Sequence, residues 1–235
     1  MAAIRSALHP GMVVLDVGGG KRPAIAPDLK ASLDLRVIGV DISQEELEAA
    51  PPGCYDQTIC GDITEGTALP AADLAIARSV TEHVTNPSAM YLHILRALRP
   101  GGSLISYVPN KFAPYALLNA ALPNQLSKVL LSFLHWESKG ETGFPAHYRH
   151  CYPSRLEALL LGVGFRDVQI YPAYRSEYCN FLLPLHASEL AWQIFTSRLN
   201  QRNLCETFTV IAQKQPESCG ASSVDAARVV GDLTH

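Results

Sequence analysis

VVLDVGGGK, residues 13–21, is the stretch that decides the fold of this chain. Apolar residues surround Asp16, and three glycines follow in a row. A buried strand that ends in a tight glycine turn is typical of the first strand of a doubly wound α/β sheet, where the turn holds a nucleotide. Glycine suits this turn because a side chain would keep the ligand away from the backbone N–H groups. We therefore expect an α/β protein with a largely parallel sheet.

The same stretch argues against a dinucleotide site. A Gly-x-Gly-x-x-Gly fingerprint that starts at Gly18 requires glycine at the position of Pro23. A carboxylate at Asp16 also suits a ligand that carries an ammonium group better than it suits a pyrophosphate. An NAD-dependent oxidoreductase is therefore disfavoured.

The spacing Asp-x-Gly-x-Gly, from Asp16 to Gly20, resembles motif I of class I S-adenosylmethionine-dependent methyltransferases. The resemblance implies a Rossmann-like, seven-stranded sheet whose last strand is antiparallel. It also implies that Asp16, Gly18 and Gly20 hold the methionine end of S-adenosyl-L-methionine. Arg22 stands where many members of the family have a third glycine.

Length and composition limit the function classes. The 235 residues are 48% hydrophobic, enough for one core, and we assign residues 1–215 to one domain. The net charge of −3 indicates no basic surface for nucleic acid. The six cysteines show no paired short spacing, which favours free thiols in a reducing compartment. With no signal peptide pattern and no run of roughly 18 apolar residues, we expect a cytoplasmic protein without an integral membrane segment.

Two further acids follow predicted strands. Asp41 ends the strand predicted over 36–41, 21 positions after Gly20, a spacing typical of the acid that binds ribose hydroxyls. Asp62 follows the strand predicted over 55–60, and the resemblance implies that it meets the adenine amino group. Ile42 and Ile63 would flank the adenine ring. The alternatives are a helix N-cap or surface acid for Asp41, and a simple turn for Asp62.

The next segment carries the strand predicted over 73–77 and its exit. Arg78, the first residue after this strand, is assigned to the cofactor site, and Glu82-His83-Val84 resembles a segment of the broad type 11 group of methyltransferases. A helix is predicted to begin at residues 86–88, and a strand is predicted over 103–108 after an Arg-Pro-Gly-Gly turn.

Two segments exceed the minimal fold. Residues 109–152 contain an apolar stripe, from Leu126 to Leu134, and we interpret them as a helical lid over the site. After a helix predicted over 154–161 and a strand over 168–174, residues 175–204 form a second helical insertion. It could line the pocket, form a homodimer contact or touch a lipid. The antiparallel strand is predicted over 206–214, and a flexible tail over 216–235.

The acceptor side is predicted to be built from polar residues near these insertions. His83 or His147 is the expected proton acceptor because the pKa of histidine lies near neutrality. Tyr148 and Arg149 are expected to hold the acceptor, and Asn110 is assigned with them. The alternative is that His83 caps a helix and His147 packs under the lid.

The neighbouring residues suggest no further site. His147, His150 and Cys151 match no tetrahedral zinc pattern, so no metal site is predicted. Arg149, Arg155 and Arg166 are interpreted as solvated or ion-paired side chains.

The resemblance thus implies a methyltransferase that acts on a small molecule, at an oxygen of a sugar or secondary metabolite. The alternatives are a lipid or isoprenoid acceptor, or a non-catalytic scaffold that retains the cofactor. Nucleic-acid methylation is disfavoured, because the Asn/Asp-Pro-Pro-aromatic run of the amino-methylating enzymes is replaced by Arg78-Ser79-Val80-Thr81.

Overall fold

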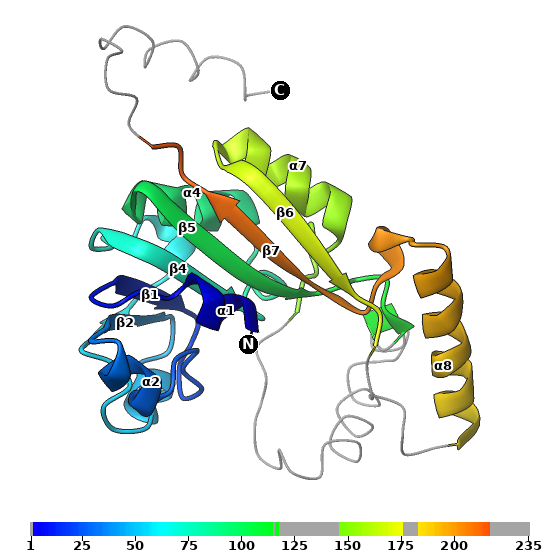
Figure 1. Ribbon diagram of the computed structural model, residues 1–235, viewed down its shortest axis with the longest axis horizontal. Helices are drawn as coiled ribbons and strands as arrows, with labels where there is room; N and C mark the ends of the chain where they lie inside the picture. The colour runs from blue at the N-terminus through cyan, green and yellow to red at the C-terminus, as the bar shows by residue number, and fades with distance from the viewer. Residues whose placement is uncertain (1, 115, 118–145, 176–182, 217–235) are drawn as a thin grey trace, which may run out of the picture.

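The computed structural model describes residues 2–114, 116–117, 146–175 and 183–216 (Figure 1). They contain a seven-stranded sheet in the order β3-β2-β1-β4-β5-β7-β6. β7 runs antiparallel to both of its neighbours, and the other neighbouring pairs are parallel. The predicted doubly wound sheet with an antiparallel last strand is confirmed. The strands are β1 (Val13–Val17), β2 (Arg36–Asp41), β3 (Gln57–Cys60), β4 (Ala72–Arg78), β5 (Leu98–Pro109), β6 (Arg166–Ala173) and β7 (Thr207–Gln213).

Helices cover both faces of this sheet. α4 and α7 pack against each other on one face (Figure 1). The helices are α1 (Ala2–Ala7), α2 (Pro27–Ser32), α3 (Gln44–Glu48), α4 (Pro87–Ala97), α7 (Pro153–Val163) and α8 (Leu183–Arg198). Two short 3₁₀ helices, η1 (Ile63–Glu65) and η3 (Arg202–Leu204), join them.

Alternate residues of each central strand feed two separate cores. In β1, Leu15 and Val17 join the cluster under α4 and α7, whereas Val14 joins the cluster with α1 and residues near α2. β4 repeats this division, with Ala75 on the first side and Leu74 on the second. Because successive strand side chains point to opposite faces, near-continuous apolar strands require cover on both.

The helix predicted to begin at residues 86–88 is confirmed, and side chains cap the starts of both α3 and α4. The Ser43 hydroxyl accepts a hydrogen bond from the backbone N–H of Glu46, and the Asn86 side chain accepts one from Ala89. α2 begins at Pro27, three residues after Ala24. Ala24 belongs to the turn, because its backbone N–H is bonded to the Asp16 carboxylate.

The structure describes only parts of the two predicted insertions. The apolar stripe from Leu126 to Leu134 and the tail over 217–235 lie outside the described residues. α8 supplies the helix expected within 175–204. Its polar Glu189, Gln193 and Thr196 are buried. The exposed large apolar residues near it are Leu190, Ile194, Phe195 and Leu199.

No helix in the described part of the chain is both long enough and apolar enough to span a bilayer.

Candidate active site

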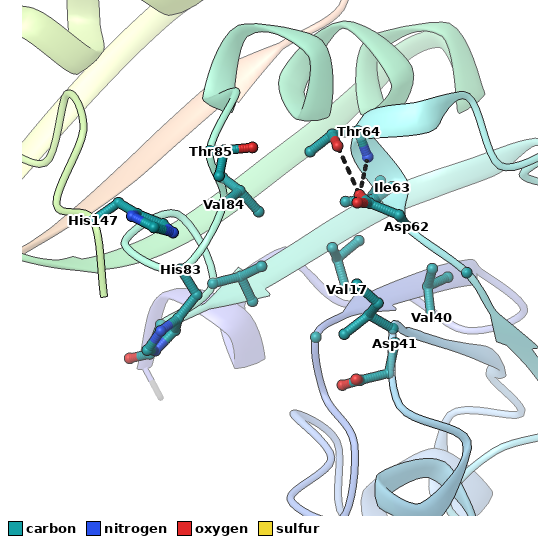
Figure 2. A pocket seen from close by; sticks show the side chains of 15 residues that line it. Val17, Val40, Asp41, Asp62, Ile63, Thr64, His83, Val84, Thr85 and His147 are labelled. Atoms are coloured by element: carbon teal, nitrogen blue, oxygen red, sulfur yellow. Dashed lines mark hydrogen bonds between the residues drawn. The ribbon is translucent and has the colours of Figure 1, made fainter. Parts of the chain in front are cut away.

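A cavity of about 300 Å³ opens at the carboxyl ends of β1, β2, β3 and β4 (Figure 2). Ligands bind at this edge in open parallel sheets because the loops that leave the strands converge there. Acidic residues lie on one side of the cavity and histidines on another (Figure 2). The lining residues are Val17, Gly18, Val40, Asp41, Ile42, Gly61, Asp62, Ile63, Thr64, Ser79, Val80, His83, Val84, Thr85 and His147.

Asp41 and Asp62 form the acidic side. Asp41 ends β2, and its Oδ1 accepts a hydrogen bond from the backbone N–H of Ser43 at 3.0 Å. Burial is the main cause that raises the pKa of the Asp41 carboxyl. Asp62 lies before η1, and its Oδ1 accepts hydrogen bonds from the backbone N–H and the hydroxyl of Thr64, both at 2.7 Å (Figure 2). These bonds orient the Asp62 carboxylate and use only one of its oxygens.

Apolar residues lie beside the two acids. Ile42 is 57% exposed although it is a large aliphatic side chain, whereas Ile63 is buried. Both line the cavity, together with Val17 and Val40. A cavity with apolar walls and a few oriented polar groups is the usual form of a site for a flat organic ring.

The glycine turn approaches the cavity closely. Gly18 has φ +66°, and a Cβ at this position would overlap the side chain of Val80. Gly20 is not among the lining residues, but a Cβ there would lie 3.1 Å from Oδ2 of Asp41. Gly20 therefore keeps space beside the Asp41 carboxylate.

Asp16 has a different position from the one predicted. It is fully buried and does not line the cavity. Its Oδ2 accepts hydrogen bonds from the Ala24 backbone N–H at 2.6 Å and the Tyr55 hydroxyl at 3.2 Å. Burial raises the pKa of Asp16 to about 6. The Tyr55 hydroxyl shares its one proton between Asp16 Oδ2 and the Gly20 carbonyl oxygen, 3.1 Å away. Asp16 and Tyr55 together thus hold the glycine turn in place.

Arg78 also lies outside the cavity lining. Its guanidinium donates a hydrogen bond to the backbone carbonyl of Arg22, so it ties the end of β4 to the glycine turn. Its charge lowers the pKa of Asp16 against the larger effect of burial. The structure therefore gives Arg78 a supporting position beside the glycine turn.

His83 and His147, predicted as alternative proton acceptors, both line the cavity (Figure 2). His83 follows β4, and Oε1 of Glu82 lies 3.8 Å from its Nε2. His147 is held from the other side, because its backbone N–H donates to the Glu82 carbonyl at 2.6 Å. The N–H of Tyr148 donates to the same carbonyl at 3.1 Å.

Glu82 is a residue that the sequence analysis did not assign to the site. Its side chain is 5% exposed, and its Oε2 has no hydrogen-bond partner among the residues that the structure describes. Burial raises the pKa of the Glu82 carboxyl to about 7. Buried carboxyl groups with a raised pKa are frequent at functional sites. Its position beside His83 was the only sequence signal that could have identified it.

Arg149, one of the three predicted acceptor residues, is bonded to a residue that lines the cavity. Its Nη1 donates to the carbonyl of Thr85, a lining residue, at 3.1 Å. Tyr148 is half-buried, and its backbone follows His147 along the wall.

Asn110, assigned to the acceptor from the sequence, does not line the cavity. Asn110 is fully buried, and its Nδ2 donates to the carbonyls of Asn203 and Cys205 at 2.9 and 2.8 Å. Its Oδ1 accepts from the Phe112 backbone N–H at 3.0 Å. These bonds join the end of β5 to the chain before β7. Asn110 is therefore a structural clamp, since its polar atoms are occupied inside the protein.

The three arginines interpreted as separate surface charges are not equivalent. Nε of Arg155 donates to Nδ1 of His150 at 2.9 Å, which brings Arg155 next to the Arg149 segment. Arg166 lies apart, at the start of β6.

Comparisons with known proteins agree with this geometry. A family model described as "Methyltransferase domain" matches residues 2–170. An uncharacterized methyltransferase of Mycobacterium bovis (strain BCG / Pasteur 1173P2) is 31% identical over 183 residues, 73% of this chain and 69% of that protein. An uncharacterized methyltransferase of Mycolicibacterium gilvum is 35% identical over 101 residues. That match covers 41% of this chain and only 39% of the relative.

A solved structure has the same fold. A SAM dependent methyltransferase from Archaeoglobus fulgidus superposes with a TM-score of 0.59 and 19% sequence identity. The superposition covers 91% of this chain and 90% of that one.

Proposed function

Because the chain belongs to the class I S-adenosylmethionine-dependent methyltransferase family, we propose that it transfers a methyl group from S-adenosylmethionine to a small-molecule acceptor. The acceptor atom that we propose is an oxygen of a sugar or secondary metabolite. One observation carries this proposal: a single cavity is lined by Asp41 and Asp62 and also by His83 and His147. It combines groups suited to a nucleoside with groups suited to a proton-bearing acceptor.

The residues around the acidic side fit the cofactor. The carboxylate of Asp41 would accept hydrogen bonds from the ribose hydroxyls, since carboxylate oxygens act only as acceptors when ionised. Asp62, oriented by Thr64, would accept from the adenine amino group through Oδ2. Ile42 and Ile63 would cover the ring. Gly18 leaves the backbone of the turn open to the cavity.

When bound, S-adenosylmethionine supplies a sulfonium-activated methyl group, so this chain needs only to align the acceptor, exclude water and take up a proton. His83 and His147 would perform the last task for a hydroxyl acceptor. Glu82 supports both, because its carboxyl lies beside His83 and its carbonyl holds His147. Arg149, fixed to Thr85, would contact the acceptor at the rim.

The test has two stages. Calorimetry with S-adenosylhomocysteine first measures cofactor binding. Tritiated S-adenosylmethionine is then supplied with a panel of hydroxylated sugars and phenols, and transfer of label is counted. We expect saturable binding and transfer to at least one hydroxyl acceptor, with His83→Ala or His147→Ala lowering turnover by roughly 10²–10⁴-fold if that histidine is the base.

The matched control is His9→Ala, which removes an exposed histidine before β1. Turnover that both site variants retain, with cofactor affinity intact, would contradict the base assignment. Binding without transfer to any acceptor would favour the scaffold alternative, and absence of binding would contradict the proposal as a whole.

A lipid or isoprenoid acceptor is the second candidate, and α8 favours it. Ile194 and Phe195 are 44% and 55% exposed on this helix, and Leu190 on the same helix and Leu199 directly after it are exposed as well. Exposed large apolar groups of this kind mark contacts with apolar partners. Flotation with neutral phosphatidylcholine vesicles tests it: association that Ile194→Ser/Phe195→Ser abolishes would support a lipid acceptor.

A further inference from the structure

Four basic side chains gather beside the histidine side of the cavity. Lys111 follows β5, Arg149 and His150 precede α7, and Arg155 lies in the first turn of α7. We call these four residues the basic group. They come from segments about 40 residues apart along the chain, and the fold brings them together.

Each cation of the basic group is fixed by a neutral partner. Nζ of Lys111 lies 4.7 Å from the ring centroids of both Phe112 and Tyr152. Arg149 donates to the Thr85 carbonyl, and Arg155 donates to the His150 imidazole. Within the described part of the chain, no ion pair joins Lys111, Arg149 or Arg155 to a carboxylate.

The charges of the basic group act on one another. The pKa of His150 is lowered first by burial and then by the charges of Arg155, Arg149 and Lys111. Cys151, next in the chain, has its pKa affected by both Glu82 and Lys111, and burial is the main cause that raises it. Glu82 is the carboxyl on this side, but it is buried and forms no ion pair with the three cations. Within the described residues, no ion pair therefore neutralises the positive charge of the basic group.

The basic group is tied to the cavity wall. Arg149 is bonded to Thr85, which lines the cavity, and it follows His147, which also lines it. The backbone contact of His147 with Glu82 holds this segment against the exit of β4. A ligand that reaches His147 can thus extend toward the basic group.

We propose that the basic group binds an oxyanion, a carboxylate or a phosphate monoester, carried by the methyl acceptor. This inference rests on the proposed function, since it assigns the substrate class of the same site. Arginine and lysine are the usual partners of such anions, and fixed side chains lose little freedom on binding them. The acceptor is therefore an anionic hydroxyl compound rather than a neutral one.

The test uses the full chain and inorganic phosphate as the probe. Imidazole resonances are followed by NMR during phosphate titration at constant ionic strength, with acetate as the carboxylate arm and chloride as the reference. We expect saturable binding of phosphate or acetate, with a rise in the pKa of His150 because the bound anion offsets the neighbouring cations. The arm that saturates at the lower concentration distinguishes a phosphate from a carboxylate group.

Variants locate the binding. Arg149→Gln and Lys111→Gln are each expected to weaken the anion about tenfold, the scale of one charge-assisted hydrogen bond. Arg36→Gln is the matched control, since it removes an exposed arginine at the amino end of β2, whereas the cavity lies at the carboxyl ends of the strands. The inference would be overturned if phosphate and acetate shifted the imidazole resonances no more than chloride does. It would also be overturned if Arg149→Gln and Lys111→Gln left the affinity for the anion unaltered.

Calorimetry with S-adenosylhomocysteine separates this outcome from failure of the proposed function. If S-adenosylhomocysteine binds but neither phosphate nor acetate does, the anionic acceptor is wrong and the methyltransferase proposal stands. If the anion binds and S-adenosylhomocysteine does not, the methyltransferase proposal is wrong, and the basic group is an anion site that serves another ligand.

Discussion

The backbone carbonyl of Glu82 accepts a hydrogen bond from the backbone N–H of His147 at 2.6 Å, across 65 positions of the chain. This bond joins the exit of β4 to the segment before α7. It explains how two histidines from distant segments line one cavity. The position of His147 therefore depends on the backbone at Glu82, and its surroundings depend on the Glu82 carboxyl.

Replacement of Glu82 with glutamine should alter the pH dependence of stability. Burial raises the pKa of Glu82 from 4.5 to about 7, so the folded state holds this proton more tightly than the unfolded state. Glu82 alone should therefore lower the free energy of unfolding by about 3 kcal/mol as pH rises from about 4.5 to 7. Glu82→Gln should reduce the wild-type fall by this amount, as measured by urea denaturation at pH 5 and 7.5, and the part due to Asp16, whose pKa burial raises to about 6, should remain.

The control for this prediction is Glu65→Gln, which neutralises an exposed carboxyl in η1. It should keep the wild-type difference between the two pH values. A Glu82→Gln protein with an unchanged difference would show that Glu82 titrates normally.

Gly18→Ala should damage both folding and cofactor binding. The position has φ +66°, and the added Cβ would overlap the Val80 side chain. Gly53→Ala is the matched comparison, since it has φ +81° but nothing within 4 Å of the added Cβ. Gly53→Ala should therefore cost only the backbone strain, on the order of 1 kcal/mol, and Gly18→Ala clearly more. Thermal unfolding of both variants, with and without S-adenosylhomocysteine, measures the difference; equal losses would contradict the overlap.

Asn110→Ala should lower stability without changing cofactor affinity. The change removes two buried donor contacts and one acceptor contact, and it leaves the carbonyls of Asn203 and Cys205 without this partner. A loss of roughly 2–4 kcal/mol in the free energy of unfolding is expected. Denaturation and calorimetry with S-adenosylhomocysteine, both below the melting temperature, check this. A variant of normal stability would mean that the clamp contributes little.

Asp41→Asn should weaken S-adenosylhomocysteine roughly 10–100-fold. The amide retains one acceptor oxygen and loses the charge, so it cannot accept from two ribose hydroxyls as a carboxylate does, a loss of about 1.5–3 kcal/mol. Asp28→Asn, an exposed acid of α2, serves as the control and should bind normally. Calorimetric dissociation constants decide; an Asp41→Asn protein with wild-type affinity would remove Asp41 from the cofactor site.

Predictions from the sequence succeeded where the position of a residue follows from its strand. Asp41 ends β2, Asp62 lies two residues after β3, and the carboxyl ends of parallel strands meet at one edge. Their common cavity could therefore be expected from spacing alone. The same reasoning placed His83 after β4.

The sequence did not indicate the surroundings of residues whose position depends on burial or on a distant partner. Asp16 belongs to the expected motif, but it is fully buried outside the cavity lining, and its Oδ2 accepts hydrogen bonds from Tyr55 and Ala24. In the sequence, Asn110 is like any polar residue after a strand. Its structural role depends on the hydrogen bond that its side chain donates to the distant Cys205 carbonyl. Such partners are set by packing between segments that the local pattern does not describe.

The sequence by itself determined the sheet, its two covered faces and the acids at the strand ends, because side-chain alternation and glycine turns are local properties. Only the tertiary structure decided that Glu82 would be buried, with its carboxyl beside His83 and its carbonyl bonded to His147. It also decided that the charges of Lys111, Arg149 and Arg155 would act on His150. Those arrangements depend on contacts between residues far apart in the chain. Burial shifts the pKa values of Glu82 and His150, and burial exists only once the chain has folded.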